Sequence, residues 1–161
     1  MTVDEAPGSA PAADRYHLAQ LNIGRSVAAI DDPAMADFVA NLDRINALGE
    51  ATPGFVWRLK DETGSATAIR AFDDPLMIVN LTVWTSVEAL RGYVYRSDHA
   101  DLFRRRREWF VPLDGPSLVL WWVPAGHIPT VAEARERLDH LAANGPTRIA
   151  FTLKTTFPPG S

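Results

Sequence analysis

The sequence predicts an α+β fold in which an antiparallel sheet packs against helices. Residues 16–23 and 76–84 alternate with the period of a strand, whereas residues 33–48 repeat apolar side chains at helical spacing. Turn signals separate the segments. The predicted order is β, α, β, β, α, β, followed by one more α and β, and its first six elements have the split βαβ, ferredoxin-like order. In that topology the first and third strands lie side by side at the centre of the sheet.

The composition is that of one globular domain. The chain has 161 residues, of which 47% are apolar and 22% charged, which suits one hydrophobic core. Residues 1–15 are rich in Ala, Pro and Asp, so we expect a flexible tail before a single domain at 16–157. The net charge of −4 disfavours a nucleic-acid partner, and the absence of cysteine excludes thiolate chemistry. Without a membrane-length apolar run or a signal-type start, the protein is expected to be cytoplasmic.

Five segments have strand patterns: residues 16–23, 55–60, 76–84, 117–123 and 148–157. The fourth, SLVLWWV, is apolar on both faces, as expected for a strand buried on both sides. The second and third are separated by residues 61–75, whose Gly64, Asp73, Asp74 and Pro75 suit a hairpin connection or loop.

The clearest helix follows the first strand. Asp31 or Asp32 is expected to cap it, with Pro33 near its first position, and Gly49 is expected to end it.

Two later helices, at about 85–95 and 130–144, are expected to open with capping boxes, in which a hydroxyl and a carboxylate satisfy free amides of the first turn. The pairs are Thr85 with Glu88 and Thr130 with Glu133. Between these helices, Ser97 or Asp98 is expected to cap a helical piece that reaches Phe110.

Both central strands carry polar side chains among apolar ones. In 76–84, Asn80 and Trp84 share a face with aliphatic residues, and in 16–23 the same pattern places Gln20 and Asn22 on one face. We expect these four residues to be neighbours on the sheet face away from the helices. A second copy of the domain would then cover that face and leave a partly polar cavity, so the prediction is a homodimer, a dimeric α/β-barrel.

Six segments resemble the family named domain of unknown function 3291, and together they span nearly all of the chain after residue 15. They are HLAQLNIGR at 17–25, ADFVANLDRINALGE at 36–50, PGFVWRL at 53–59, VNLTVW at 79–84, HADLFRRRREWF at 99–110 and LWWVPAGHIPT at 120–130. The resemblance implies the dimeric α/β-barrel superfamily, which includes antibiotic-biosynthesis and haem-degrading monooxygenases.

The superfamily implies candidate catalytic residues. The cofactor-independent monooxygenases use an Asn and a Trp four residues apart on the third strand, which here are Asn80 and Trp84. The amide would hold the oxyanion of a phenolate-like substrate, and the indole would form one wall. Haem-degrading members use a set similar to Asn22, Trp84 and His99, although His99 lies fifteen residues beyond Trp84, farther than that pattern expects. His99 is therefore a candidate base or, alternatively, a haem ligand.

Further residues are expected to bind the substrate. One arginine of Arg104 to Arg107 should face the cavity and hold an anion, with Arg104 or Arg107 favoured; ion pairs with the protein's own acids are the competing interpretation. The complete set of expected substrate-binding residues is Gln20, Asn22, Trp57, Tyr95, Arg104, Arg107 and Trp122. The four histidines lack ligand spacing, so no metal site is expected.

These observations favour a small-molecule enzyme, with monooxygenase-like activity on an apolar or aromatic substrate and no cofactor. Two alternatives stay open: a haem-binding or haem-degrading protein that uses His99, and a non-catalytic domain that binds a hydrophobic ligand.

Overall fold

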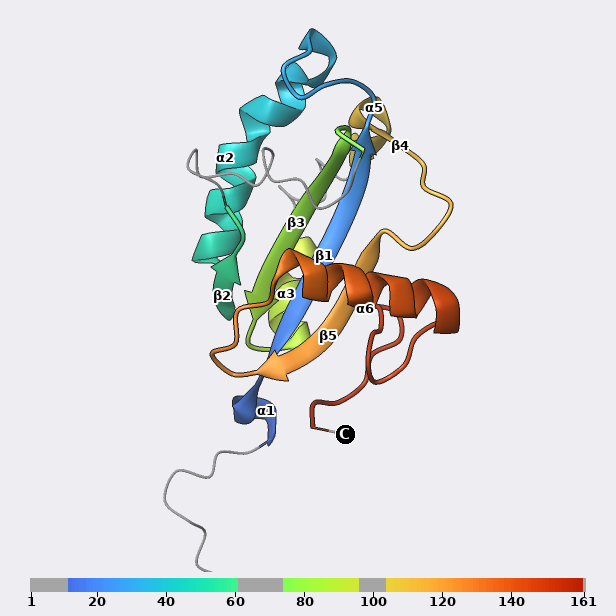
Figure 1. The fold of residues 1–161 in the computed structure, drawn as a ribbon. Coiled ribbons are helices and arrows are strands. Elements are labelled where there is room, and N and C mark those ends of the chain that lie inside the picture. The colour runs from blue at the N-terminus through green and yellow to red at the C-terminus, as the bar shows by residue number, and fades with distance from the viewer. Residues whose placement is uncertain (1–11, 61–73, 96–103, 161) are drawn as a thin grey trace, which may run out of the picture.

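In a computed structural model, residues 12–60, 74–95 and 104–160 are described, and they form a five-stranded antiparallel sheet with helices on both faces (Figure 1). The strands are β1 (Tyr16–Ser26), β2 (Phe55–Arg58), β3 (Met77–Trp84), β4 (Phe110–Val111) and β5 (Leu118–Pro124). The order is β2-β3-β1, and the other edge of β1 pairs with β5 along Tyr16 to Asn22 and with β4 at Arg25 and Ser26. The order of β1, β2, β3 and β5 confirms the ferredoxin-like prediction.

The helical elements are α1 (Ala12–Arg15), η1 (Pro33–Met35), α2 (Ala36–Ala51), α3 (Val87–Val94), α5 (Arg106–Trp109) and α6 (Val131–Asn144). Asp32 caps the first of the long helical stretches, because its carboxylate accepts from the amide of Ala34 in η1. Thr130 caps α6 through the amide of Glu133, as the sequence indicates.

Two predicted helix boundaries are wrong. Ser86, not Thr85, caps α3, because the Ser86 hydroxyl accepts from the amide of Ala89. Gly49 lies inside α2, which continues to Ala51, and it packs against the Tyr93 ring, so it does not end the helix.

The two faces of the sheet have different coverings. One face of β1 and β3 presents Ala19, Leu21, Val79 and Leu81, which pack with Ala134, Leu138 and Leu141 of α6. The other face presents Leu18 and Trp84, which pack with Val87 and Leu90 of α3. Figure 1 shows α6 crossing one side of β1 and β5, with α3 on the opposite side.

The amide face therefore points toward α2 and α3, not away from the helices as we expected. Gln20 and Asn22 share a face with Leu18, and Asn80 shares a face with Trp84, because side chains alternate along a strand. Alternation groups the residues of one face but does not specify which face the helices cover. The opposite face is covered within the chain by α6, so the argument for a second copy loses its basis, and the homodimer stays a prediction that sedimentation can test.

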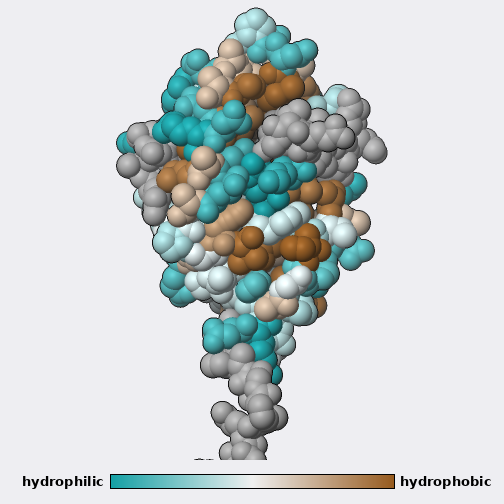
Figure 2. Space-filling view, turned by 90° about the vertical axis from the view of Figure 1, so that its left-hand side faces the viewer, coloured by the Kyte–Doolittle hydropathy of each residue, from teal (hydrophilic) through white to brown (hydrophobic). Residues whose placement is uncertain are grey.

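The outer side of the α2 and β2 layer is mixed in character. Val39 and Val56 are exposed there, and Figure 2 shows apolar groups separated by polar ones over this side. Among the described residues, no helix is long and apolar enough to span a membrane.

The predicted terminal strand at 148–157 is wrong. Within that range only Phe151 bridges the sheet, where it exchanges two backbone hydrogen bonds with Leu120 at 2.8 and 2.9 Å. Phe151 is buried and packs near Trp122 and Phe157. The alternation of apolar and polar residues in this segment therefore does not mark a paired strand; the segment is attached to the sheet at the buried Phe151. The predicted helix up to Phe110 also ends early, since Phe110 and Val111 pair with β1 as β4.

Candidate functional site

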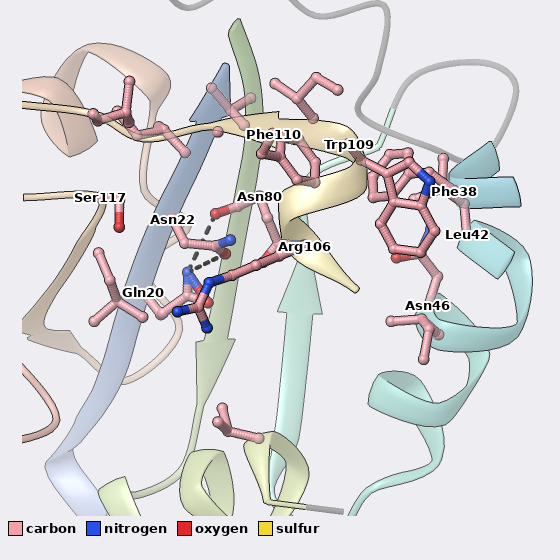
Figure 3. A pocket seen from close by; sticks show the side chains of 18 of the residues that line it. Gln20, Asn22, Phe38, Leu42, Asn46, Asn80, Arg106, Trp109, Phe110 and Ser117 are labelled. Carbon is pink, nitrogen blue, oxygen red and sulfur yellow. Dashed lines mark hydrogen bonds between the residues drawn. The ribbon is translucent and has the colours of Figure 1, made fainter. Parts of the chain in front are cut away.

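A cavity of about 950 Å³ lies between the amide face of the sheet and the helical layer. Its described lining comes from β1, β3, α2, α3, and the α5 and β4 segment (Figure 3). The polar side chains on the sheet side are Gln20, Asn22 and Asn80, and the apolar walls include Phe38, Leu42, Ile45, Trp109, Phe110 and Leu118. The arrangement is a mostly apolar chamber with a polar floor, which is typical of small-molecule sites.

The pairing register of β1 and β3 brings the polar side chains of the floor together. Gln20 is paired with Thr82 and Asn22 with Asn80 across β1 and β3, so each pair projects on the same face at cross-strand neighbour distance. Gln20 and Thr82 are buried, at 5% and 7% exposure, whereas Asn22 is exposed to the cavity even though it lies on a central strand.

A chain of hydrogen bonds runs from Trp84 to Asn22. The Trp84 indole Nε1 donates to Thr82 Oγ1 at 2.8 Å, and Thr82 Oγ1 donates to Gln20 Oε1 at 3.3 Å. Gln20 Nε2 then donates to Asn22 Oδ1 at 3.0 Å and to the backbone oxygen of Asn80 at 3.3 Å. The buried members, Trp84, Thr82 and Gln20, therefore all have hydrogen-bond partners, as buried polar groups require.

The hydrogen bonds of this chain run in one direction. The indole N–H donates to the Thr82 hydroxyl, and that hydroxyl donates its own proton to Gln20. Gln20 turns its amide nitrogen to Asn22, whose carbonyl oxygen accepts from it. What Asn22 offers to the cavity is its NH₂ group, which is a pair of donors.

Asn80 and Asn46 add two more amides to the cavity lining, one from β3 and one from α2. Within the described part of the chain, neither side chain has a hydrogen-bond partner. Because the oxygen and nitrogen of such an amide are interchangeable by rotation, these two can donate or accept as a ligand demands.

The aromatic wall is held by close packing on β1. Phe38 of α2 lies 5.6 Å from the Trp109 ring and 5.1 Å from the Phe110 ring, centroid to centroid. A Cβ on Gly24 would come within 2.7 Å of Phe110 Cδ1, so the missing side chain at Gly24 allows the Phe110 ring to rest on the strand. Gly24 thus fixes where this wall stands.

The arginines of 104–107 divide into different roles. Arg105 pairs with Asp37 at 2.9 Å and Glu108 at 2.8 Å and lies 4.6 Å from the Trp109 ring centroid. The hydrogen bond from Arg105 holds the pKa of the Glu108 carboxyl below its usual value. Arg105 therefore ties α5 to α2 as an ion-paired residue, in agreement with the competing interpretation for that position.

Arg106 and Arg107 line the cavity, whereas Arg104 is not among its described lining residues. In Figure 3 the Arg106 side chain extends from α5 toward Gln20 and Asn22. A guanidinium and the Asn22 NH₂ group both carry only donors on the sides they present, so together they suit an oxygen acceptor.

Tyr93 closes the cavity beside Trp84. Its ring stacks on Trp84 at 5.3 Å, and its hydroxyl donates to the backbone oxygen of Ile45 at 3.4 Å. Burial raises the pKa of the Tyr93 hydroxyl to about 12. Tyr93 is accordingly a neutral donor near neutral pH and not a base.

Some of the sequence-predicted site residues meet at this cavity and others do not. Gln20, Asn22, Asn80, Tyr95 and Arg107 line it. Among the other candidates, Trp84 is 1% exposed and reaches the cavity only through the hydrogen-bond chain. Trp57 packs on the face that α6 covers, and the Trp122 indole donates to the backbone oxygen of Phe157 at 2.7 Å. Neither tryptophan is among the described lining residues. His99 lies outside the described residues, so its roles as base or haem ligand stay predictions.

Sequence reasoning missed the contributions of α2 and α3. Phe38, Asn46 and Tyr93 were assigned no role in the site, and Arg106 was passed over for its neighbours. The polar Asn41 and Asn46 within the otherwise apolar stripe of α2 were the available signal. Among the described residues, no group of three or more His, Asp or Glu side chains could hold a metal ion.

A family comparison identifies the chain. The model of the family described as Domain of unknown function (DUF3291) matches residues 17–161. The chain belongs to this family. No curated protein matches it.

Several solved structures are similar to this chain. SnoaB, a cofactor-independent oxygenase from Streptomyces nogalater, is 18% identical, with 70% of this chain and 95% of SnoaB covered and a TM-score of 0.43. PA3566 from Pseudomonas aeruginosa is 11% identical, with 71% and 98% covered and a TM-score of 0.47. A protein from Chloroflexus aurantiacus described as a putative antibiotic biosynthesis monooxygenase is 17% identical, with 71% and 98% covered and a TM-score of 0.41.

Proposed function

We propose that this protein binds an apolar or aromatic small molecule in the sheet-helix cavity and oxidises it with molecular oxygen, without a tightly bound metal or organic cofactor. The observation that carries the proposal is the NH₂ group of Asn22, which faces the cavity beside Asn80 on the floor of a mostly apolar chamber. Donors held in place where negative charge develops are the commonest means of stabilising an anionic transition state.

The chemistry suited to such a floor is the oxidation of an activated phenol. The phenol gives up its O–H proton, and the amides of Asn22 and Asn80 hold the resulting oxygen anion. Molecular oxygen then reacts at the ring position opposite the anion. The C–H and O–H bonds of the phenol are replaced by two C=O bonds, with one oxygen atom of O₂ retained in the quinone and the other released as water. The substrate supplies the electrons, so the step needs no further reductant.

The walls contribute by covering a bound substrate. Phe38, Trp109 and Phe110 form an aromatic side that can stack on a ring-shaped substrate. Where the bound ring displaces water from the floor, the hydrogen bonds from amide to anion are stronger than in bulk solvent.

The test is oxygen consumption with a panel of activated phenols, including 1-naphthol, and mass analysis of the products. Replacing Asn22 or Asn80 by Ala should lower turnover about 100-fold, the usual cost of one oxyanion donor. Asn144→Ala is a matched control, since that amide lies at the end of α6 on the other side of the sheet. Full turnover in both Asn22→Ala and Asn80→Ala contradicts the site assignment.

A second candidate function is a non-catalytic carrier for a hydrophobic ligand. The cavity's size and apolar walls favour it, because these features alone suffice for binding. A carrier returns its ligand chemically unchanged, so recovery of every bound phenol intact under oxygen supports the carrier over the oxygenase.

A further inference from the structure

The amide floor of the cavity has apolar surface on two different sides. Toward the end of β1, the Phe110 ring rests on Gly24, two residues beyond Asn22. Phe38 of α2 packs against that ring at 5.1 Å between centroids, and together they form an aromatic side. Across the sheet, the β5 residue paired with Asn22 is Leu118, which also lines the cavity. The floor therefore separates the aromatic side from a second, aliphatic side.

The aliphatic side is completed by Leu153, which comes from the segment after α6. Leu153 lines the cavity and packs against the same core cluster as Leu118. It belongs to residues 151–157, which we call the C-terminal strap. The strap is attached to β5 on both sides of Leu153, through the backbone of Phe151 at 2.8 and 2.9 Å and the backbone oxygen of Phe157 at 2.7 Å. These bonds fix the path of the chain past the cavity.

A side chain of α3 holds Leu153 itself. Arg91 Nη2 donates to the backbone oxygen of Leu153 at 2.6 Å. Arg91 is half-buried, and it is not among the described residues that line the cavity. A hydrogen bond from a charged donor is about twice as strong as a neutral one, so this contact fixes the strap against α3. Arg91 thus acts on the cavity through Leu153.

The two apolar sides call for a ligand with two apolar parts. The cavity volume of about 950 Å³ is that of a site for a drug-sized ligand rather than for one small ring. An apolar wall contributes to binding only where a ligand removes it from water. A bare ring on the aromatic side would leave Leu118 and Leu153 uncovered, whereas an alkyl group that extends across the floor covers both.

We infer that the cavity takes an aromatic ring that carries a short alkyl arm, with the oxygen function between the ring and the arm. The ring lies on the aromatic side, the oxygen meets the Asn22 amide, and the arm lies against Leu118 and Leu153. Leu153 determines the specificity for the arm, and Arg91 is its positioning residue. The inference rests on the proposed function, for which it names the substrate class: a phenol with an alkyl group next to its hydroxyl.

The test compares two ligands that differ only in the arm, methyl 1-naphthyl ketone and butyl 1-naphthyl ketone, by calorimetric titration. Neither is a phenol, so binding is measured apart from turnover. We expect the wild type to bind the butyl ketone about 50-fold more tightly, the ratio that three buried CH₂ groups give. Leu153→Phe fills the aliphatic side and should lower this ratio about tenfold by weakening the butyl ketone alone.

Ile149→Phe is the matched control for the added ring. Ile149 is 50% exposed and lies outside the described cavity lining, so this variant should keep the wild-type ratio. Unchanged affinity for the methyl ketone shows that Leu153→Phe has kept its fold; where it has not, the variants of Arg91 decide.

The variants of Arg91 leave every described lining residue in place. Arg91→Met removes the donor to the Leu153 oxygen and keeps an apolar stem, so the strap loses its bond to α3 and the ratio should fall. Arg91→Lys keeps a cationic donor and should recover part of the ratio. A loss of unfolding free energy in Arg91→Met with an unchanged ratio overturns the positioning role.

Equal affinity of the wild type for the two ketones overturns the inference, as does a wild type that binds neither. A ratio that survives in Leu153→Phe, or that falls equally in Ile149→Phe, also overturns it. A preference for the longer arm without oxygen consumption by any phenol rejects the oxygenase alone, and oxygen consumption without that preference rejects this inference alone.

Discussion

The indole nitrogen of Trp84 donates to the hydroxyl of Thr82 at 2.8 Å, and this bond begins the hydrogen-bond chain that ends at Asn22 on the cavity floor. Trp84 is not among the described residues that line the cavity. Its influence passes through Thr82 and Gln20 to Asn22, which places Trp84 and Thr82 as positioning residues.

Thr82→Val tests this relay with almost no change of shape. The variant leaves the buried Trp84 N–H and the Gln20 oxygen without partners, which should cost about 1–3 kcal/mol of unfolding free energy. Gln20 is then free to reverse its amide, so the turnover of 1-naphthol should also fall. Thr82→Ser restores the hydroxyl and should recover the turnover. Loss of stability with unchanged turnover would assign Thr82 a purely structural role.

Gly24→Ala should move the aromatic wall. The new Cβ would lie 2.7 Å from Phe110 Cδ1, so the ring has to shift, at a cost of about 1–3 kcal/mol in unfolding free energy. The turnover of 1-naphthol should drop with it. Gly92→Ala is the control, because nothing lies within 4 Å of that Cβ and alanine favours the helical backbone of α3. A thermal unfolding series in which both variants match the wild type contradicts the packing argument.

The buried hydroxyl of Tyr93 should make the unfolding free energy decrease at alkaline pH. Burial raises its pKa in the folded protein to about 12, above the ordinary value of 10.0 for an unburied tyrosine. Between these two values the unfolded chain binds fewer protons than the folded one, so the unfolding free energy decreases as pH rises. The stabilisation is complete below pH 10.0 and lost as pH passes about 12. Denaturant titrations should show a shallower decline in Tyr93→Phe, and equal slopes would remove Tyr93 as the cause.

The fold was predictable because strand and helix periods are strong local signals. The alternation in β1 and β3 correctly placed Gln20 and Asn22 on the same sheet face as Asn80. The order of the elements correctly predicted that the two strands lie side by side. What alternation could not decide was which face the helices cover. That depends on α6, whose apolar stripe of Ala134, Leu138 and Leu141 occupies the face we expected to carry α2 and α3.

The candidate site was predictable on the strands and not on the helices. An amide in a strand stands out against apolar neighbours, so Asn22 and Asn80 could be found from the sequence. Arg106 could not be separated from three adjacent arginines, because the short α5 helix ends where Phe110 pairs with β1, and this pairing sets the direction of each side chain. The strand predicted at 148–157 failed for a related reason: one bridge at Phe151 anchors the segment, and no partner strand extends the pairing.

The most direct test of the amide floor is a two-dimensional ¹H–¹⁵N spectrum of the side-chain NH₂ groups. The spectrum is followed during titration with 2-naphthoate, an aromatic carboxylate that stands in for the phenolate of the proposed reaction. Asn22→Ala and Asn80→Ala assign the two signals by their disappearance, and Asn144 serves as an internal reference on the far side of the sheet. We predict that the Asn22 and Asn80 protons move downfield on saturation while Asn144 stays in place, as expected for donors that gain an anionic acceptor. Saturable binding that leaves both the Asn22 and the Asn80 signals unmoved would contradict the role of these amides.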